Sequence, residues 1–199
     1  MLVEKRKMKV VGLTGSMASG KEVVKDFLAR KYNMWYVSLS SIIRAELEKK
    51  KQSFNRLTLQ DHGNELRKKY GSHILTKLAV EYLQKDKELI VVDGIRNMGE
   101  ASWLKQQFGR DFVLVAVDAP QNLRFERICS RNRPTDPKTW EEFLEVDKRD
   151  QGDGEPEYGQ HTGQCIKEAD FVITNDGSKE EFEKKVIDVI ENLWVEKID

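Results

Sequence analysis

The sequence predicts an α/β fold in which a mostly parallel, five-stranded sheet is covered by helices on both faces. Short continuous apolar runs are typical of strands that are buried on both sides in a parallel sheet. Polar stretches with helical periodicity separate these runs, so strands and helices alternate along the chain. A glycine-rich turn joins the first run to the first helix. The expected strands span residues 9–14, 35–37, 89–92, 112–117 and 170–174.

The glycine-rich turn ends at Lys21, where the helical pattern begins. Glycines allow successive backbone N–H groups to turn toward one anion, and the helix N-terminus adds the positive end of its dipole. Lys21 supplies a mobile cation that can reach terminal phosphates. This spacing predicts a phosphate-binding P-loop, and the alternative is a plain tight turn before a helix. The expected nucleotide-binding residues of the turn are Gly15, Ser16, Met17, Ala18, Ser19, Gly20 and Lys21.

The residue after the P-loop lysine departs from the usual pattern. A Ser or Thr that ligates magnesium normally follows the lysine, whereas this chain has Glu22. One interpretation gives Glu22 a role at the nucleotide. The other is an acidic residue that favours the helix dipole in the first turn and faces solvent.

Length and composition favour one soluble α/β domain over residues 1–199. The formal net charge is zero, which removes the general electrostatic case for nucleic-acid binding. No apolar run is long enough to span a bilayer, and the N-terminus lacks a signal-peptide core. Cys129 and Cys165 are isolated thiols, as expected in a reducing compartment. We therefore expect a cytoplasmic monomer or homodimer without nucleic-acid or membrane partners.

Two stretches, residues 40–85 and 131–163, exceed a minimal core of sheet and helices. The first is long, helical and polar, with a break over residues 50–57. The second is rich in proline and glycine, and a helix is expected to start where Asp136 precedes Pro137. Loops that follow parallel strands lie on the same sheet edge as the P-loop. Both stretches are therefore placed to close over a bound nucleotide.

Several short motifs follow one another along nearly the whole chain. They are residues 12–15 with the P-loop, 37–44, 63–67 with Tyr70 and Gly71, 92–96, 118–120, 124–133, 136–143 and 169–177. In this order they resemble P-loop kinases of nucleoside monophosphates and of dephospho-coenzyme A. The likeness is to dephospho-coenzyme-A-kinase-like and deoxynucleoside-monophosphate-kinase-like proteins. It implies a three-layer P-loop NTPase fold that binds ATP and Mg²⁺, with residues 40–85 as an acceptor-binding region and residues 131–163 as a lid.

Asp93 ends an expected strand and precedes Gly94. A carboxylate there can hold a magnesium-bound water near the phosphates, so Lys21 and Asp93 are candidate catalytic residues. The alternative for Asp93 is a turn-forming residue before glycine. The resemblance implies that Arg96, on the same loop, meets the acceptor phosphate, and the alternative is a surface ion pair.

The first long stretch contains arginines, whose guanidinium groups bind phosphate bidentately. The resemblance implies that Arg44 and Arg67 contact the acceptor phosphate. Ser38 adds a hydroxyl contact to the acceptor or caps the following helix. Three further cations are expected on a solvated face: Arg56, Lys68 and Lys69.

Arg124, Arg127 and Arg131 recur at helical spacing, share one helix face, and are followed by Arg133. Positioned cations stabilise the charge of a phosphoryl group in transfer. The resemblance implies that Arg127 and Arg131 take part in catalysis and that Arg133 clamps ATP. The alternative is a set of ion pairs with neighbouring acids, and we expect at least one of the four arginines to be structural.

The C-terminal segment combines a possible adenine contact with a helix. In the kinases that the chain resembles, turns like that at Asn175 and Gly177 lie against adenine, and the alternative is an ordinary strand-to-helix turn. The last helix starts at Ser178, which forms a capping-box pattern with Glu181. Its apolar stripe is interpreted as core packing and comprises Phe182, Val186, Ile187, Ile190, Leu193 and Trp194.

Two positions depart from the resembled kinases. Those kinases usually carry an aspartate where this chain has Ser41, and a serine, threonine or glycine where this chain has Glu22. Our hypothesis is that the two changes offset each other, with Glu22 and Asp93 holding magnesium directly or through water. The rival hypothesis is that both changes weaken metal binding and leave a nucleotide-binding protein with little catalysis.

The leading functional prediction is an ATP-dependent phosphotransferase acting on a nucleoside or deoxynucleoside monophosphate. An alternative is dephospho-coenzyme A kinase, but its hydroxyl acceptor needs a base, and the expected aspartate is missing at Ser41. A monophosphate acceptor is already charged and needs none. Further alternatives are a non-catalytic nucleotide-binding regulatory protein and, more weakly, a nucleic-acid-linked ATPase.

Overall fold

The computed structural model describes residues 8–83 and 86–193. The five strands are parallel and form one sheet in the order β2–β3–β1–β4–β5. The expected fold class is confirmed. The chain adds β2 and β3 on one side of β1 and then β4 and β5 on the other, so the topological switch point lies at β1. The strands are β1 (Lys9–Thr14), β2 (Met34–Ser38), β3 (Leu89–Ile95), β4 (Phe112–Asp118) and β5 (Phe171–Thr174).

The third strand is longer than the apolar run that predicts it. It continues through Asp93 and Gly94 because β1 still pairs with it there, with Leu13 opposite Asp93. Pairing with a neighbouring strand, rather than apolar character, therefore sets the end of β3. As a result Asp93 is a residue of β3 itself, near the carboxyl end of the strand, and does not lie in the loop that follows.

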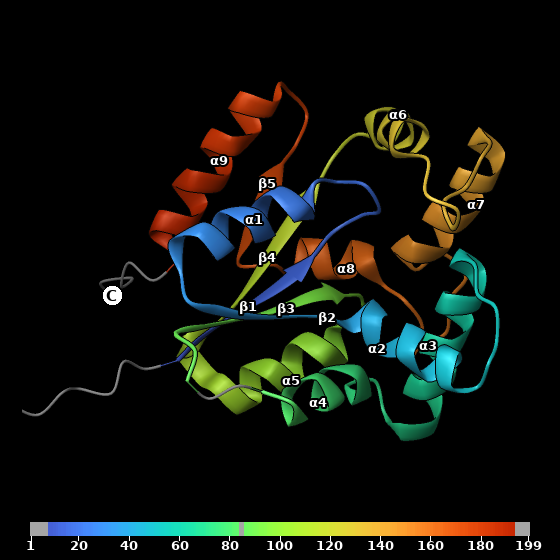
Figure 1. Ribbon diagram of the computed structural model, residues 1–199, viewed down its shortest axis with the longest axis horizontal. Helices are drawn as coiled ribbons and strands as arrows, with labels where there is room; N and C mark the ends of the chain where they lie inside the picture. The colour runs from blue at the N-terminus through green and yellow to red at the C-terminus, as the bar shows by residue number, and fades with distance from the viewer. Residues whose placement is uncertain (1–7, 84–85, 194–199) are drawn as a thin grey trace, which may run out of the picture.

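Helices cover both faces of the sheet (Figure 1). One face packs against α1 (Lys21–Lys31) and α9 (Lys179–Asn192), with Leu13 and Val115 in the shared core. On the other face Val10 and Val92 contact the remaining core helices. These helices are α2 (Leu39–Lys49), α3 (Arg56–Tyr70), α4 (Ile74–Glu81), α5 (Met98–Phe108) and α8 (Thr162–Lys167), with the 3-10 turn η1 (Gly109–Asp111) before β4.

The capping box predicted for the last helix is present. Ser178 Oγ accepts a hydrogen bond from the Glu181 backbone N–H, and a Glu181 carboxylate oxygen accepts one from the Ser178 N–H. In the apolar stripe of α9, Phe182, Val186 and Ile190 are buried. Ile187 is half-buried, Leu193 is buried just after the helix, and Trp194 lies outside the described residues.

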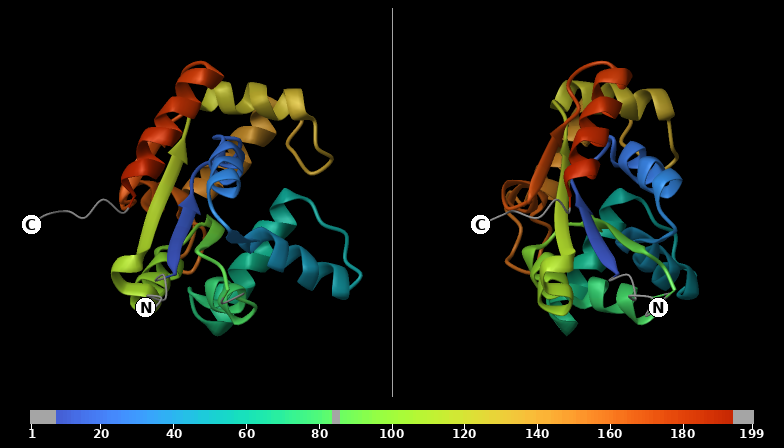
Figure 2. Two further views of the ribbon diagram at one scale, coloured as in Figure 1. Left: turned by 60° about the vertical axis from the view of Figure 1, so that its left-hand side comes forward. Right: turned by 90° about the vertical axis from the view of Figure 1, so that its left-hand side faces the viewer.

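Two further helices are α6 (Gln121–Arg131) and α7 (Trp140–Gln151). They lie at the carboxyl edge of the sheet, on the side opposite to α2 and α3 (Figures 1 and 2). A small core of Met17, Ile128, Phe143 and Val146 joins them to the P-loop. Among the described residues, no helix has the length and apolar character needed to cross a membrane.

The predicted start of α7 is wrong. The helix begins at Trp140, and the side chain of Thr139 accepts its first capping bond, from Glu142 N, at 3.2 Å. Asp136 does not cap this helix because both of its carboxylate oxygens accept hydrogen bonds from Arg131, at 2.7 and 2.8 Å.

Candidate functional site

The turn between β1 and α1 has the backbone of a phosphate-binding loop. Gly15 and Gly20 have φ angles of 137° and 114°, in the left-handed region that favours glycine. A Cβ atom on Gly15 would lie 2.0 Å from the carbonyl oxygen of Val117, so only glycine lets the loop pass β4 this closely. Lys21 Nζ donates to the carbonyl oxygens of Gly15, at 2.6 Å, and Ser16, at 2.9 Å. The lysine side chain therefore lies back across the loop.

Residues from distant elements hold this loop in place. Ser16 Oγ donates to Asp118 at 2.8 Å and accepts a hydrogen bond from Gln151, at the end of α7, at 3.0 Å. Asn175 Nδ2 donates to the Ser19 carbonyl at 2.8 Å. Sequence reasoning gave no role to Asp118 or Gln151. For Asp118 a signal existed, because it ends the strand next to β1.

Burial lowers the pKa of Lys21 to about 7, from an ordinary value of 10.5. The carboxylate of Asp93 opposes this lowering of the pKa, and the positive charges of Arg96 and Arg56 add to it. In the unfolded chain Lys21 keeps its proton up to the ordinary value. Between the two values the unfolded state binds more protons, so raising the pH stabilises the ligand-free fold.

We expect this effect to appear in a comparison with Lys21→Met. Between about pH 7 and pH 10, the free energy of unfolding of the ligand-free wild type should rise relative to that of Lys21→Met, because methionine binds no proton. Urea denaturation at several pH values measures the difference. Lys31→Met, an exposed lysine on the same helix, should leave the pH dependence as in the wild type. Parallel curves for wild type and Lys21→Met would contradict the prediction.

Asp93 lies beside this lysine with one oxygen bound and one free. Tyr36 Oη donates to Asp93 Oδ2 at 2.7 Å. Asp93 Oδ1 is buried and has no hydrogen-bond partner in the part of the chain that the structure describes. Such an oxygen suits Mg²⁺ or a water bound to it. The described residues contain no group of three or more His, Cys, Asp and Glu that could hold a metal, so the remaining ligands would be phosphate oxygens and water.

Glu22 and Arg133, predicted separately as nucleotide-binding residues, form an ion pair with each other. Arg133 Nη2 and Glu22 Oε1 are 2.8 Å apart, and both side chains are about half exposed or more. The hydrogen bond from Arg133 is the main reason that the pKa of Glu22 is lowered. The pair joins the first turn of α1 to the loop between α6 and α7. A metal ion bound by Glu22 would therefore compete with Arg133.

The other arginines of the predicted row have different surroundings. Arg127 lies on the P-loop, where it donates to the carbonyl oxygens of Ala18, Ser19 and Asn175 at 3.2–3.5 Å. Arg131 pairs with Asp136, as the alternative interpretation proposed. Arg124 is buried, forms a two-point ion pair with Asp147 and also donates to the Ala119 carbonyl. Arg124 thus has structural contacts, as expected of at least one of the four arginines.

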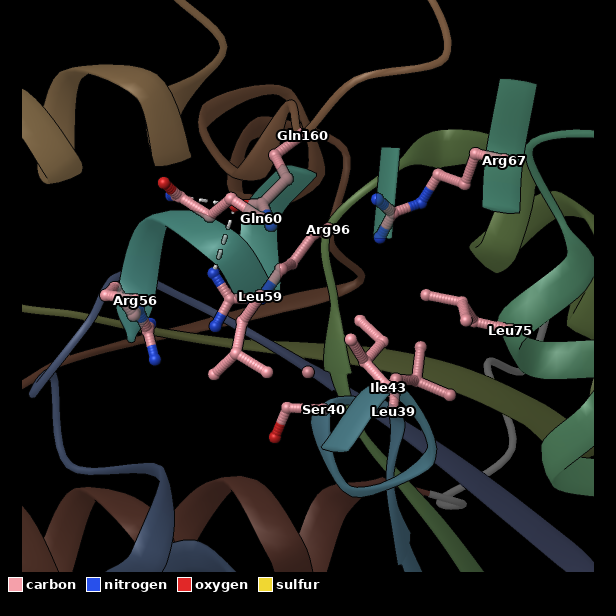
Figure 3. A pocket seen from close by; sticks show the side chains of 11 residues that line it. Leu39, Ser40, Ile43, Arg56, Leu59, Gln60, Arg67, Leu75, Arg96 and Gln160 are labelled. Atoms are coloured by element: carbon pink, nitrogen blue, oxygen red, sulfur yellow. Dashed lines mark hydrogen bonds between the residues drawn. The ribbon is translucent and has the colours of Figure 1, made fainter. Parts of the chain in front are cut away.

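A pocket beside the P-loop is rich in arginine. Figure 3 shows Arg96 between Arg56 and Arg67, with aliphatic side chains around them. The expectation for Arg56 is wrong: it is half-buried and lines this pocket, whereas Lys68 and Lys69 are exposed. Asn55 caps α3 through a capping box with Thr58 and so places Arg56 in the first turn. The lining residues are Leu39, Ser40, Ile43, Arg56, Leu59, Gln60, Arg67, Leu75, Gly94, Arg96 and Gln160.

Two of the three pocket arginines have carboxylate partners. Arg67 pairs with the buried Glu100 at 2.8 Å, and Arg96 pairs with the buried Asp150. Within the described residues Arg56 forms no ion pair, so the pocket has an excess positive charge. Burial lowers the pKa of Arg96 to about 9 and that of Arg56 to about 10, and both remain charged at neutral pH.

Three of the predicted site residues take no part in the contacts described above for the P-loop and the arginine pocket. Ser38 bonds through its hydroxyl to Ser40, at 2.9 Å, and does not line the pocket. Arg44 is half-buried on α2, and the effect of its charge on the pKa of Arg56 shows that it is nearby. Gly177 is exposed in the turn before α9, whereas Asn175 in the same turn contacts the P-loop.

Solved structures share this architecture. TT1252 from Thermus thermophilus superposes with a TM-score of 0.64 at 17% identity, covering 95% of this chain and 99% of the other. Shikimate kinase from Aquifex aeolicus and dephospho-CoA kinase from Campylobacter jejuni both give a TM-score of 0.52, at 17% and 15% identity. Each of these two comparisons covers 92% of this chain and 96% of the enzyme. The fold is therefore that of P-loop kinases.

Sequence relatives cover nearly the whole chain. A family model described as an AAA domain matches residues 14–144, which include the P-loop and the arginine row. A UPF0200 protein of Thermococcus onnurineus is 34% identical over 193 residues, covering 94% of this chain and 99% of the relative. One of Thermococcus gammatolerans is 36% identical over 189 residues, covering 92% and 95%. The chain therefore belongs to the UPF0200 family. Its residues 14–144 match the AAA-domain family model, and its fold is that of P-loop kinases.

Proposed function

We propose that the protein is an ATP-dependent phosphotransferase that phosphorylates a nucleoside or deoxynucleoside monophosphate. The observation that carries the proposal is the pairing of two anion sites on one sheet edge. Lys21 lies across the P-loop, and the arginine pocket lies close enough for Arg96 and Arg56 to lower the pKa of Lys21. Two neighbouring sites suit two phosphorylated substrates.

In this function Lys21 and the loop amides hold the β- and γ-phosphates of ATP. Arg56, Arg67 and Arg96 bind the acceptor phosphate. One oxygen of that phosphate forms a bond to the γ-phosphorus while the bond from the γ-phosphorus to the β-phosphate oxygen breaks, and ADP leaves. The attacking oxygen already carries negative charge and needs no base. Residues 131–163 act as a lid that excludes water and so suppresses hydrolysis.

Magnesium, when bound, would stabilise charge on the transferring phosphoryl group, and Asp93 and Glu22 are the residues proposed to hold it. The free, buried oxygen of Asp93 supports this role. The same oxygen also favours a second candidate, dephospho-CoA kinase, because a free carboxylate can accept the proton of a hydroxyl acceptor.

A coupled assay of ADP release tests the proposal. Purified protein is given ATP and magnesium with each ribo- and deoxynucleoside monophosphate and with dephospho-CoA, and ATP alone is the control. The proposal expects release that depends on a monophosphate. Release only with dephospho-CoA would support the second candidate. ATP binding without release in any mixture would instead indicate a regulatory nucleotide-binding protein.

Variants of Glu22 test its proposed metal role. Glu22→Ala should lower turnover and raise the Mg²⁺ concentration needed for half the maximal rate. Glu22→Thr should recover part of the loss, because a hydroxyl is the usual ligand at this position. Arg133→Ala separates metal binding from the ion pair, since it removes the pair and leaves the carboxylate. Full activity in both Glu22 variants would refute the metal role, and equal losses in Glu22→Ala and Arg133→Ala would assign the effect to the ion pair.

A further inference from the structure

Tyr36 lies on the edge strand β2 and reaches the neighbouring strand. In the parallel register Tyr36 is opposite Val91, and Ser38 is opposite Asp93. Tyr36 and Asp93 are therefore diagonal neighbours on the sheet face that carries α1, a separation that an aromatic side chain can bridge. The ring ends in the 2.7 Å hydrogen bond from Oη to Asp93 Oδ2.

The tyrosine ring has a second support. Lys25 of α1 places its Nζ 5.7 Å from the ring centroid, within the range of a cation–π contact. Although 37% of the residue is exposed, the ring is thus held between α1 and β3. Burial of the hydroxyl and the charge of Asp93 raise the pKa of Tyr36 above its ordinary value. Because an ionised carboxylate only accepts hydrogen bonds, the Tyr36 hydroxyl is the donor to Asp93.

The two oxygens of Asp93 have different surroundings. Oδ2 is bound by Tyr36, whereas Oδ1 is buried and without a partner in the described part of the chain. A carboxylate with one oxygen fixed has lost most of its rotational freedom, so the direction of the other oxygen is set. Groups that orient ligating carboxylates in this way commonly change metal affinity and activity when they are removed.

We propose that Tyr36 is a positioning residue for phosphoryl transfer, which fixes Asp93 through Oδ2 and leaves Oδ1 for magnesium or its bound water. The inference rests on the proposed function, because the role of Asp93 belongs to that function. The contacts of Tyr36 in the structure are with Asp93 and Lys25, and the proposal gives it no direct contact with substrate or metal. It acts through Asp93, and its hydroxyl is the group that matters.

Tyr36→Phe removes that hydroxyl and keeps the ring against Lys25. We expect kcat to fall about tenfold, while the KM values for ATP and the acceptor change by less than about twofold. A variant that merely loosened the sheet would change both KM values and the unfolding temperature. Tyr82→Phe is the matched control, because Tyr82 is 77% exposed. It should match the wild type in every measurement.

A binding measurement tests the inference without turnover. Mn²⁺ titrations of the protein with ADP, followed by electron paramagnetic resonance, should show about tenfold weaker metal binding in Tyr36→Phe. Wild-type kcat and Mn²⁺ affinity in Tyr36→Phe, with both reduced in Asp93→Asn, would overturn the inference and leave the proposed function intact. If the wild type transfers no phosphate to any acceptor, the proposed function fails. The Mn²⁺ titration then still decides whether Tyr36 positions Asp93.

Discussion

Replacing Lys21 by methionine is expected to lower phosphoryl transfer about 100- to 1000-fold, the cost typical of removing one preorganised group that stabilises transition-state charge. Lys21 lies across the P-loop, where its positive ammonium can stabilise the negative charge that develops on the β- and γ-phosphates. Methionine has a similar length and stays apolar, so the buried site keeps its packing while losing the cation. The change should therefore affect chemistry more than folding.

Steady-state rates with the best acceptor measure this effect, and calorimetry with ATP measures binding. Lys31→Met is the matched control, because Lys31 is exposed at the far end of α1, where it pairs with the exposed Glu191 at 3.4 Å and lies over the rings of Phe27 and Tyr32. It should retain the wild-type rate. A Lys21→Met protein that turned over ATP and acceptor at the wild-type rate would remove the basis for placing ATP in this loop.

The strands and the P-loop could be predicted because their signals are local. An apolar run, a turn that requires glycine at Gly15, and a lysine at the helix start all lie within a few residues of one another. The capping box at Ser178 is a local signal of the same kind. Such features depend little on how the rest of the chain packs, and for this reason the fold class followed from the sequence.

The partners of charged side chains could not be predicted, because they are set by packing between distant elements. Glu22 and Arg133 are 111 positions apart, and Tyr36 and Asp93 are 57 apart. Arg56 and Lys68 are both basic residues of α3, yet the fold places Arg56 in the pocket and leaves Lys68 exposed. Asp136 illustrates the same limit. Its sequence matches a helix cap, but pairing with Arg131 takes both of its oxygens.

Arg124→Met is expected to destabilise the protein by about 3–5 kcal/mol, the cost typical of leaving one member of a buried ion pair without its partner. Asp147 is fully buried and receives two hydrogen bonds from Arg124, so among the described residues the variant leaves its charge with the weaker bond from Gln121 at 2.9 Å. Urea denaturation measures the loss. Arg133→Met is the matched control, because its ion pair with Glu22 is exposed and should contribute at most about 1 kcal/mol.

The double variant Arg124→Met/Asp147→Leu separates the cost of an unpaired charge from the loss of packing. If charge dominates, two apolar side chains of similar size should restore most of the stability, since buried ion pairs often contribute little net stability compared with apolar replacements. The guanidinium of Arg124 also lies 5.4 Å from the Phe143 ring centroid, in the core that joins α6 and α7 to the P-loop. A double variant no more stable than Arg124→Met would show that this packing, and not the ion pair, fixes α7 against the loop. In that case the hydrogen bond from Gln151 to Ser16 would depend on the packing of the Arg124 side chain and not on its charge.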